Sequence, residues 1–358
     1  MMEKKMNRRE FVKASLATGA LVLAGDMVKG GMNLAYGAVK IPEVEKATVT
    51  VITDNYYDFT RPNYKIAKRL HTAFTSPPDS PVWNTTLHAE HGLAYHIEAA
   101  VDGQPHSFLF DYGTDFQGVK SNMELLNIDF RKLEALGLSH DHFDHQVALV
   151  QLLKSKRELI RTGIPFYVGE QTFVGTFWKF PDGRVVSLAA LRREDIESLG
   201  FVKIVEVKDP TPIVPGAYLT GRIEQVTEYE KIPPGFVAKR GDKFEQEHFI
   251  GEQAVVLNVK GKGLIVLSGC AHRGIVNAVK HAQKMTGVEK VHAVIGGFHL
   301  TGAKPELIQR TIADIKAIAP DYIVPTHCTG FEAITAFAKE MPDQFIINTV
   351  GTRYIFTA

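Results

Sequence analysis

The sequence predicts an α/β protein, a four-layer αββα sandwich in which helices cover the outer faces of two packed β-sheets. Three observations lead to this fold class. β-branched and aromatic runs alternate with segments of helical periodicity, two β-rich halves of the chain are each followed by helices, and 45% hydrophobic with 23% charged residues is an ordinary globular composition. Because no long polar linker interrupts this pattern, we expect one domain over residues 39–358.

Residues 1–38 are expected to be a twin-arginine export signal that precedes the fold. Arg8 and Arg9 stand before an apolar run, ASLATGALVLAG, and the small residues of LAYGA at 34–38 offer a cleavage site. The run is about a dozen residues, whereas a bilayer span needs roughly 20, so no stable membrane anchor is expected. We therefore expect the twin-arginine export machinery as a partner and a periplasmic or other extracytoplasmic location. An amphipathic helix with two chance arginines is the alternative.

The first half of the mature chain alternates strand and helix patterns. The segment 92–113 predicts two strands joined by a turn at Asp102-Gly103, a pair that favours hairpin turns. The apolar spacing predicts further strands at 47–54 and 133–139, and helices at 117–128 and 145–160.

The second half begins with a region of weak periodicity and ends with clearer elements. Residues 165–250 are rich in Pro and Gly, and we expect them to form strands and loops over the active face. Aromatic residues of this region are candidates for setting specificity, namely Trp178, Phe180, Tyr229 and Phe236. After it come an expected hairpin at 253–272, a helix at 273–287, a strand at 291–300, a helix at 304–319 and a strand at 321–330.

Residues 137–146, GLSHDHFDHQ, place three histidines and two aspartates within six positions behind an apolar strand. His140 and His142 are two residues apart, so they point to one side of the backbone, while Asp144 and His145 turn toward a neighbouring point. Imidazole and carboxylate groups bind zinc, iron or manganese, and two adjacent ligand sets are what two-metal hydrolysis requires. A polar loop in which Asp144 caps the following helix is the structural alternative.

The pattern His-x-His-x-Asp-His at 140–145 resembles the signature of the metallo-β-lactamase superfamily. The segments AEHGLAYHIE (89–98), FDYG (110–113), GCAHRGIVNAV (269–279), IGGFHL (295–300) and PTHCTG (325–330) extend the resemblance over nearly all of the mature chain. They are similar to a branch labelled dihydropterin-(ribofuranosyl)aminobenzene-phosphate synthase-like, whose members are mostly called metal-dependent hydrolases. The resemblance implies the metallo-β-lactamase fold and a metal centre.

Carried over residue by residue, the resemblance implies two metal sites. The first would be held by His140, His142 and a third ligand, His272, for which His248 is an alternative. The second would be held by Asp144, His145 and His327. Asp144 would also orient the nucleophile, and Asp111 would orient a ligand imidazole, a turn before Gly113 being its alternative role. His299 is a candidate for contact with substrate or metal, with packing as the alternative.

Cys270 departs from the commonest superfamily pattern, because it stands where a metal-bridging Asp would be. A thiolate prefers zinc or iron over manganese, and a small buried residue without a metal contact is the alternative. Cys270 could also pair with Cys328 if the strand ends meet. Without the carboxylate bridge, the second metal is expected to be held less firmly than the first.

The ligand set implies a hydrolase that uses a metal-bound hydroxide on an ester, lactone, amide or phosphodiester. We expect one or two divalent ions, zinc first, with iron or manganese as alternatives, and a small-molecule substrate that the sequence does not identify. An iron redox protein and a metal-stabilised binding protein without turnover are the rival functions. A net charge of +1 gives no reason to expect nucleic acid, and two cysteines exclude a disulfide scaffold or a four-thiolate zinc site.

Overall fold

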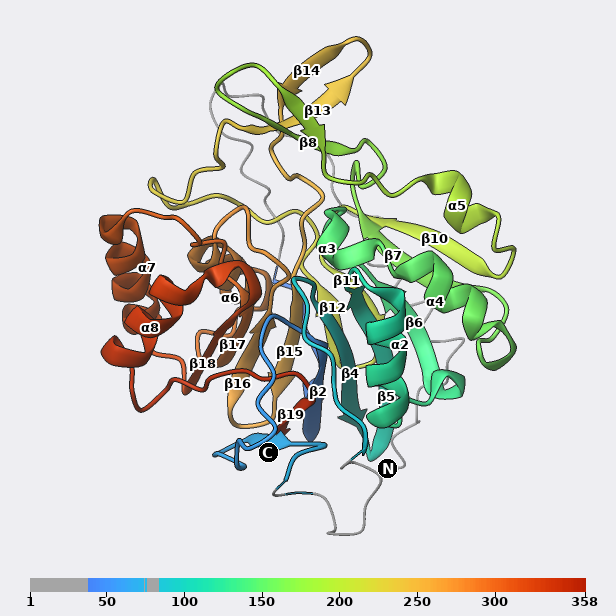
Figure 1. Cartoon of the computed structure of the whole chain (residues 1–358). Coiled ribbons are helices and arrows are strands. Elements are labelled where there is room, and N and C mark those ends of the chain that lie inside the picture. Colours follow the sequence, from blue (N-terminus) through green and yellow to red (C-terminus); the bar gives the residue numbers. More distant parts are fainter. Residues whose placement is uncertain (1–37, 74, 76–83) are drawn as a thin grey trace. The chain divides into compact units, whose positions relative to one another are not determined.

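Two β-sheets packed face to face form the centre of the fold, with helices outside both (Figure 1). The structure is a computed structural model that describes residues 38–73, 75 and 84–358. The export signal expected at 1–38 lies, apart from Ala38, outside these residues, and the prediction stays untested.

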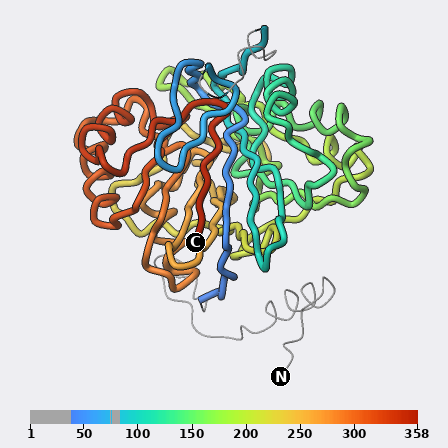
Figure 2. Tube along the Cα trace, turned by 90° about the horizontal axis from the view of Figure 1, so that it is seen from below, coloured from blue at the N-terminus to red at the C-terminus, as the bar shows by residue number. Residues whose placement is uncertain are grey.

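The first sheet has eight strands and includes the last strand of the chain. Their order is β10 (Val202–Val207), β7 (Ile164–Gly169), β6 (Leu133–Gly137), β5 (Gln104–Tyr112), β4 (Ala94–Val101), β2 (Lys46–Thr53), β19 (Thr352–Thr357) and β3 (Ala67–Arg69). Figure 2 shows the last strand, β19, beside β2, and the two pair antiparallel. The expected turn joins β4 to β5, where Asp102 and Gly103 take φ angles of 52° and 71°. Two such left-handed residues match the right-handed twist of a hairpin.

The second sheet has seven strands. Their order is β11 (Thr211–Val214), β12 (Ala217–Leu219), β15 (Val255–Val259), β16 (Gly263–Leu267), β17 (Val291–Gly297) and β18 (Tyr322–Thr326), with β1 (Glu43–Val44) paired to β15. β16, β17 and β18 are parallel neighbours, so their carboxyl ends meet at the same edge. The segments that follow these three strands carry most of the later histidines and both cysteines.

Helices cover the outer face of each sheet, which confirms the expected αββα layers (Figure 1). The first sheet is covered by α2 (Phe116–Leu125), α3 (Phe143–Gln146), α4 (Leu149–Ser155) and α5 (Arg193–Glu197). The second is covered by α6 (Ile275–Thr286), α7 (Pro305–Ile318) and α8 (Phe331–Glu340). Between the sheets, buried side chains such as Phe108 and Val255 form one shared core. In the described part of the chain no helix is both long and apolar enough to span a membrane.

The helix expected at 145–160 is interrupted, and this part of the sequence prediction is wrong. A continuous helix would bond the Ala148 amide to the carbonyl of Asp144. That carbonyl accepts instead from the Leu93 amide at 2.9 Å, and the Ala148 amide donates to the Gly113 carbonyl at 3.3 Å. Nor does Asp144 cap the helix, since α3 begins after His142. The break fixes the short α3 against the ends of β4 and β5.

The region 165–250 contributes more to the main sheets than its weak periodicity indicated. Four of its strands, β7, β10, β11 and β12, form one edge of each sheet. The rest includes a separate four-stranded sheet of β14 (Lys243–Gln246), β13 (Phe236–Arg240), β8 (Thr176–Lys179) and β9 (Val185–Ser187), which lies beyond the ends of the main strands (Figure 1).

Candidate metal centre

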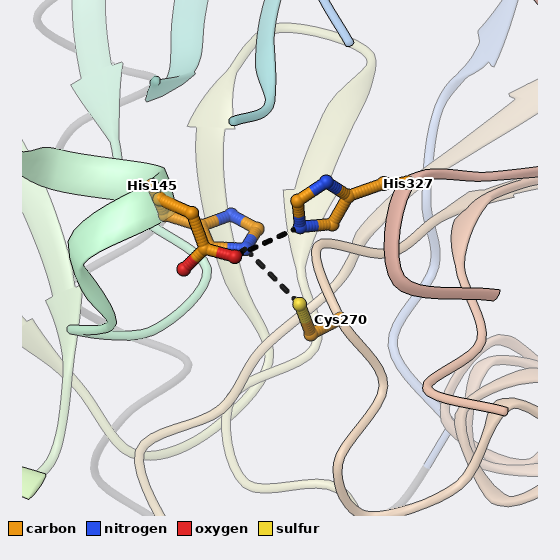
Figure 3. Close-up of side chains that lie close together, drawn as sticks. His145, Cys270 and His327 are labelled. Atoms are coloured by element: carbon orange, nitrogen blue, oxygen red, sulfur yellow. Dashed lines mark hydrogen bonds and ion pairs between the residues drawn. The ribbon is translucent and has the colours of Figure 1, made fainter. Parts of the chain in front are cut away.

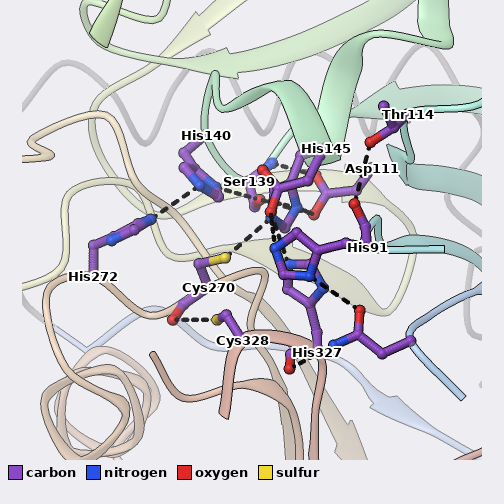
Figure 4. A network of polar contacts seen from close by, with 12 residues as sticks. His91, Asp111, Thr114, Ser139, His140, His145, Cys270, His272, His327 and Cys328 are labelled. Atoms are coloured by element: carbon purple, nitrogen blue, oxygen red, sulfur yellow. Dashed lines mark hydrogen bonds and ion pairs between the residues drawn. The ribbon is translucent and has the colours of Figure 1, made fainter. Parts of the chain in front are cut away.

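Nine donor side chains gather at one edge of the fold, where loops of the two sheets meet (Figure 4). His140 and His142 follow β6 of the first sheet, and Asp144 and His145 lie on α3 beside it. The facing loops follow β16, β17 and β18 of the second sheet. They supply Cys270, His272, His299, His327 and Cys328.

The first donor set consists of His140, His142 and His272, whose ligand nitrogens all lie within 4.8 Å of one another. His140 Nε2 and His272 Nε2 are 3.2 Å apart, close to the roughly 3.3 Å that separates two nitrogens on a tetrahedral zinc ion. His142 Nε2 is buried without a hydrogen-bond partner. Burial lowers the pKa of His142 to about 3, which keeps the imidazole in the neutral form that binds metals. The sequence prediction of His272 as the partner of these two histidines agrees with this placement.

The second donor set consists of Asp144, His145, Cys270 and His327. Asp144 Oδ2 lies 3.1 Å from His327 Nε2, and His145 Nε2 lies 3.1 Å from Cys270 Sγ. Figure 3 shows His145, Cys270 and His327 pointing toward one another. Asp144 Oδ1 is buried and has no hydrogen-bond partner. Burial opposes a charge on His327, but the hydrogen bond to Asp144 together with the negative charges of Cys328, Asp144 and Asp54 outweighs it and raises the pKa of His327 to about 9.

Asp111 orients the second set, as expected from the sequence. Its Oδ2 accepts from His145 Nδ1 at 2.7 Å and from Ser139 Oγ at 2.8 Å, and its Oδ1 accepts from the Ser139 amide at 2.7 Å. A carboxylate only accepts hydrogen bonds, so Nδ1 carries the imidazole proton and Nε2 is left free to bind a metal. Asp111 is fully buried and takes a φ of 61° at the end of β5.

Left-handed residues recur where the chain leaves the other strands. Ala271, His299 and His327 have φ angles of 51°, 47° and 52°. Non-glycine residues rarely adopt this conformation, and where they do the surroundings hold them in place. The sharp turns keep the donor side chains at the strand ends.

Glu252 holds the loop that carries His272, a role that sequence reasoning missed. Its two carboxylate oxygens accept from the amides of His272 and Arg273, each at 2.7 Å. Burial raises the pKa of Glu252 to about 7 despite these hydrogen bonds. The residue precedes the strand VVLNV in the sequence, and nothing in its spacing marks it as a neighbour of the histidines.

The side of the centre that faces solvent is bordered by His91 and by an aromatic wall. His91 stacks on His327 with ring centroids 4.8 Å apart, and its Nε2 lies 3.4 Å from Asp144 Oδ2. Its side chain is 55% exposed, the most accessible of these imidazoles. On the other side Phe236 stacks on His142 at 5.4 Å, and Trp178 packs on Phe236 at 4.9 Å.

One of the four aromatic residues proposed for specificity, Phe236, therefore reaches the centre, while Trp178 packs on Phe236 and Phe180 packs on Trp178. Tyr229 does not, since its hydroxyl donates to Asp314 of α7 at 2.7 Å. His248 is exposed and belongs to none of the donor sets found in the described residues, so it does not take the place of His272. Its backbone carbonyl accepts from Arg273 instead.

A third donor set consists of Cys270, His299 and Cys328, again within 4.8 Å of one another. Both cysteines are buried and free, so the strand ends meet without a disulfide. Cys328 Sγ donates to the Cys270 carbonyl at 3.6 Å. His299 Nδ1 is buried without a hydrogen-bond partner. The sequence had given His299 and Cys270 as separate candidates, and it had not combined them with Cys328 as ligands.

The donors of the first two sets fit a divalent transition metal. They offer five imidazoles, one carboxylate and one thiol, the groups that bind zinc and iron, and His327 would give up its proton when an ion binds. Buried nitrogen and oxygen atoms without partners, such as His142 Nε2 and Asp144 Oδ1, are otherwise costly, and a bound ion would satisfy them.

Comparison with known proteins gives relatives of similar length and a similar fold. The chain is 34% identical over 276 residues to a 7,8-dihydropterin-6-methyl-4-(beta-D-ribofuranosyl)-aminobenzene-5'-phosphate synthase of Methanocaldococcus jannaschii, covering 76% of this chain and 92% of the relative. An uncharacterised protein of the same organism is 26% identical over 263 residues, covering 74% and 92%.

A solved structure, of a metal-dependent hydrolase of the beta-lactamase superfamily, superposes with a TM-score of 0.65 at 20% identity, over 87% of this chain and all of that one. No protein-family model matches the sequence.

Proposed function

This chain belongs to the metallo-β-lactamase superfamily, and we propose that it is a metal-dependent hydrolase of small molecules that carry an ester, lactone, amide or phosphodiester bond. One observation supports this most strongly. Two buried donor sets, each built from both sheets, meet at a single edge through the segment His140–His145. Bound divalent ions would supply an acidified water and an electrophile for the developing oxyanion.

The residues around the donors have distinct tasks in this proposal. Asp111 fixes the tautomer of His145, Ser139 Oγ contacts His140 Nδ1, and Glu252 fixes the backbone at His272. The aromatic wall of Phe236 and Trp178 excludes water from one side and offers an apolar surface to a substrate. The other side, at His91, is open to solvent and gives the leaving group a route out.

The test compares metal content with turnover. His142→Ala and Asp144→Ala each remove a central donor, so each should lose at least one metal equivalent and reduce turnover of a responsive ester, lactone or phosphodiester by more than about a hundredfold. His248→Ala is the matched control, because His248 is an exposed histidine outside the donor sets. A folded Asp144→Ala protein with unchanged metal content and rate would refute the proposal.

A second candidate is a synthase reaction at the same centre. It is favoured by the 34% identity to a protein named for the synthesis of a dihydropterin aminobenzene ribofuranosyl phosphate. The two candidates differ in their products. Incubation with a dihydropterin and an aminobenzene ribofuranosyl phosphate should give a joined product only if the synthase candidate is right, whereas hydrolysis of a simple ester or phosphodiester favours our main proposal.

A further inference from the structure

We infer that Cys270, His299 and Cys328 form a separate binding site for a thiophilic divalent metal ion such as Zn²⁺ or Cd²⁺, with Cys270 shared between this site and the second donor set. The site goes beyond the hydrolytic centre, whose two ions need neither His299 nor Cys328. Three features support this site, namely the placement of the three donors, their burial and the chemistry of sulfur.

The donors come together because three parallel strands end side by side. Cys270 follows β16, His299 follows β17 and Cys328 follows β18. Hydrogen bonds tie the loops to each other: the Gly297 amide donates to the Gly269 carbonyl at 2.9 Å, and the Phe298 amide donates to Thr329 Oγ1 at 3.0 Å. The third set therefore belongs to one sheet alone, unlike the first two sets.

The packing leaves space for the sulfur of Cys328. A Cβ on Gly297 would lie 2.7 Å from Cys328 Sγ, a separation that real Cβ atoms do not show, so only glycine allows this approach. The φ angle of Gly297 is not positive, unlike that of its neighbour Gly296, so the backbone conformation alone does not require glycine at 297. The lack of a side chain at 297 thus serves the thiol and the loop that carries it.

The donor chemistry selects the ion. Two thiols and one imidazole are a soft set, which binds zinc and heavier thiophilic ions in preference to magnesium, calcium or manganese. Donor atoms around a tetrahedral zinc ion are about 3.3 to 3.8 Å apart, as follows from bonds of about 2.0 to 2.3 Å. The three donors already lie within 4.8 Å, so closing on an ion requires movements of about 1 Å.

His299 provides the observation that points to a ligand rather than to simple packing of two thiols. Its Nδ1 is buried without a hydrogen-bond partner, and its backbone is held at a φ of 47°. A buried polar atom without a partner costs free energy. The imidazole also has a hydrogen bond to the Cys328 side chain, and an ion bound through Nδ1 would remove that cost.

The experiment titrates the reduced, metal-free full-length protein with Cd²⁺ and follows bound cadmium together with the ultraviolet absorption of cadmium–thiolate bonds. We expect three equivalents for the parent. Cys328→Ser should bind two and lose about two thirds of the thiolate absorption, because two of the three cadmium–sulfur bonds are gone when Cys270 no longer bridges to a third ion. His299→Ala keeps both thiols and should bind the third equivalent at least about tenfold more weakly. His248→Ala serves as the histidine control and should behave as the parent.

A double variant separates this site from the hydrolytic centre. His142→Ala combined with Asp144→Ala disables the first two sets but leaves Cys270, His299 and Cys328 intact. It should still bind one Cd²⁺ with the absorption of two cadmium–thiolate bonds, whether or not the protein is a hydrolase. If Cys328→Ser binds as many equivalents as the parent with the same absorption, or if the double variant gives no cadmium–thiolate absorption while folded by circular dichroism, the third site does not exist.

Discussion

Replacing Asp111 by Asn should weaken the second donor set without changing the shape of the site. The carboxylate accepts three hydrogen bonds, from His145 Nδ1, the Ser139 amide and Ser139 Oγ. The side-chain amide of Asn has only one oxygen that accepts hydrogen bonds. Its NH₂ group therefore takes the place of one carboxylate oxygen and faces groups that were donors. The Ser139 backbone N–H cannot adapt, whereas the serine hydroxyl can rotate and the imidazole can change tautomer. We therefore expect the NH₂ group to face His145.

In this orientation His145 must change tautomer. Its Nδ1 accepts a hydrogen bond from the NH₂ group, and the imidazole proton moves to Nε2. Nε2 is the atom that lies 3.1 Å from Cys270 Sγ and would bind the metal. Loss of such an orienting partner usually costs about 10-fold to 100-fold in metal affinity, which is about 1.4 to 2.7 kcal/mol. The metal-free protein should lose about 1 to 2 kcal/mol of unfolding free energy, because hydrogen bonds to a charged carboxylate are replaced by weaker bonds to a neutral amide.

The assay is competition for Zn²⁺ against a chromophoric chelator, with urea unfolding of the metal-free protein alongside. Asp129→Asn is the matched control, because Asp129 accepts from the Arg131 amide at a helix start and contacts no imidazole. Its zinc affinities should equal those of the parent. If folded Asp111→Asn also binds every equivalent of Zn²⁺ as tightly as the parent, Asp111 is only a turn residue before Gly113 and the tautomer argument fails.

Three further predictions concern export, acid stability and metal preference. Arg8→Lys with Arg9→Lys should leave the protein inside the cell by fractionation, and normal export would contradict the signal. Burial first, then Arg353, lowers the pKa of His96 from 6.5 to about 4. As the pH falls, the unfolded state therefore takes up this proton at a higher pH than the folded state does. Because protonation favours the unfolded state, the unfolding free energy should drop by about 3 kcal/mol from pH 7 to 4. His96→Gln should lack that part of the loss in urea unfolding at both pH values. Mn²⁺ should leave the second set before the first during stepwise chelation. Cys270→Asp should raise the Mn²⁺ affinity of the second set by about tenfold, because a carboxylate suits Mn²⁺ better than a thiolate. Equal release of Mn²⁺ from both sets would contradict this.

Features encoded within a short stretch of sequence were predictable. The Asp102-Gly103 turn needs only two residues that tolerate positive φ, and the alternation of His140 and His142 needs only the local backbone. The order of strands and helices also follows from periodicity. These elements were enough to predict the layers of the fold and the position of the histidine cluster.

Features that depend on distant contacts were not predictable in the same way. The break after α3 arises because the Leu93 amide takes the Asp144 carbonyl, a contact across 51 residues that no local pattern shows. Spacing could not decide between His248 and His272, because only the fold exposes one and buries the other. The meeting of Cys270 with Cys328 likewise depends on the pairing of β16, β17 and β18.

The first two donor sets draw on both sheets, and this ties metal occupancy to the folding equilibrium. A chain in which the sheets have separated has no place where all the donors of either set meet, so an ion binds the native state alone. By mass action, free metal at about a thousandfold above its dissociation constant adds about 4 kcal/mol to the unfolding free energy. The ions would crosslink the loops of the two sheets. Chelation should then speed amide hydrogen exchange first in the segments where the two sheets meet, and the strands inside each sheet should stay protected.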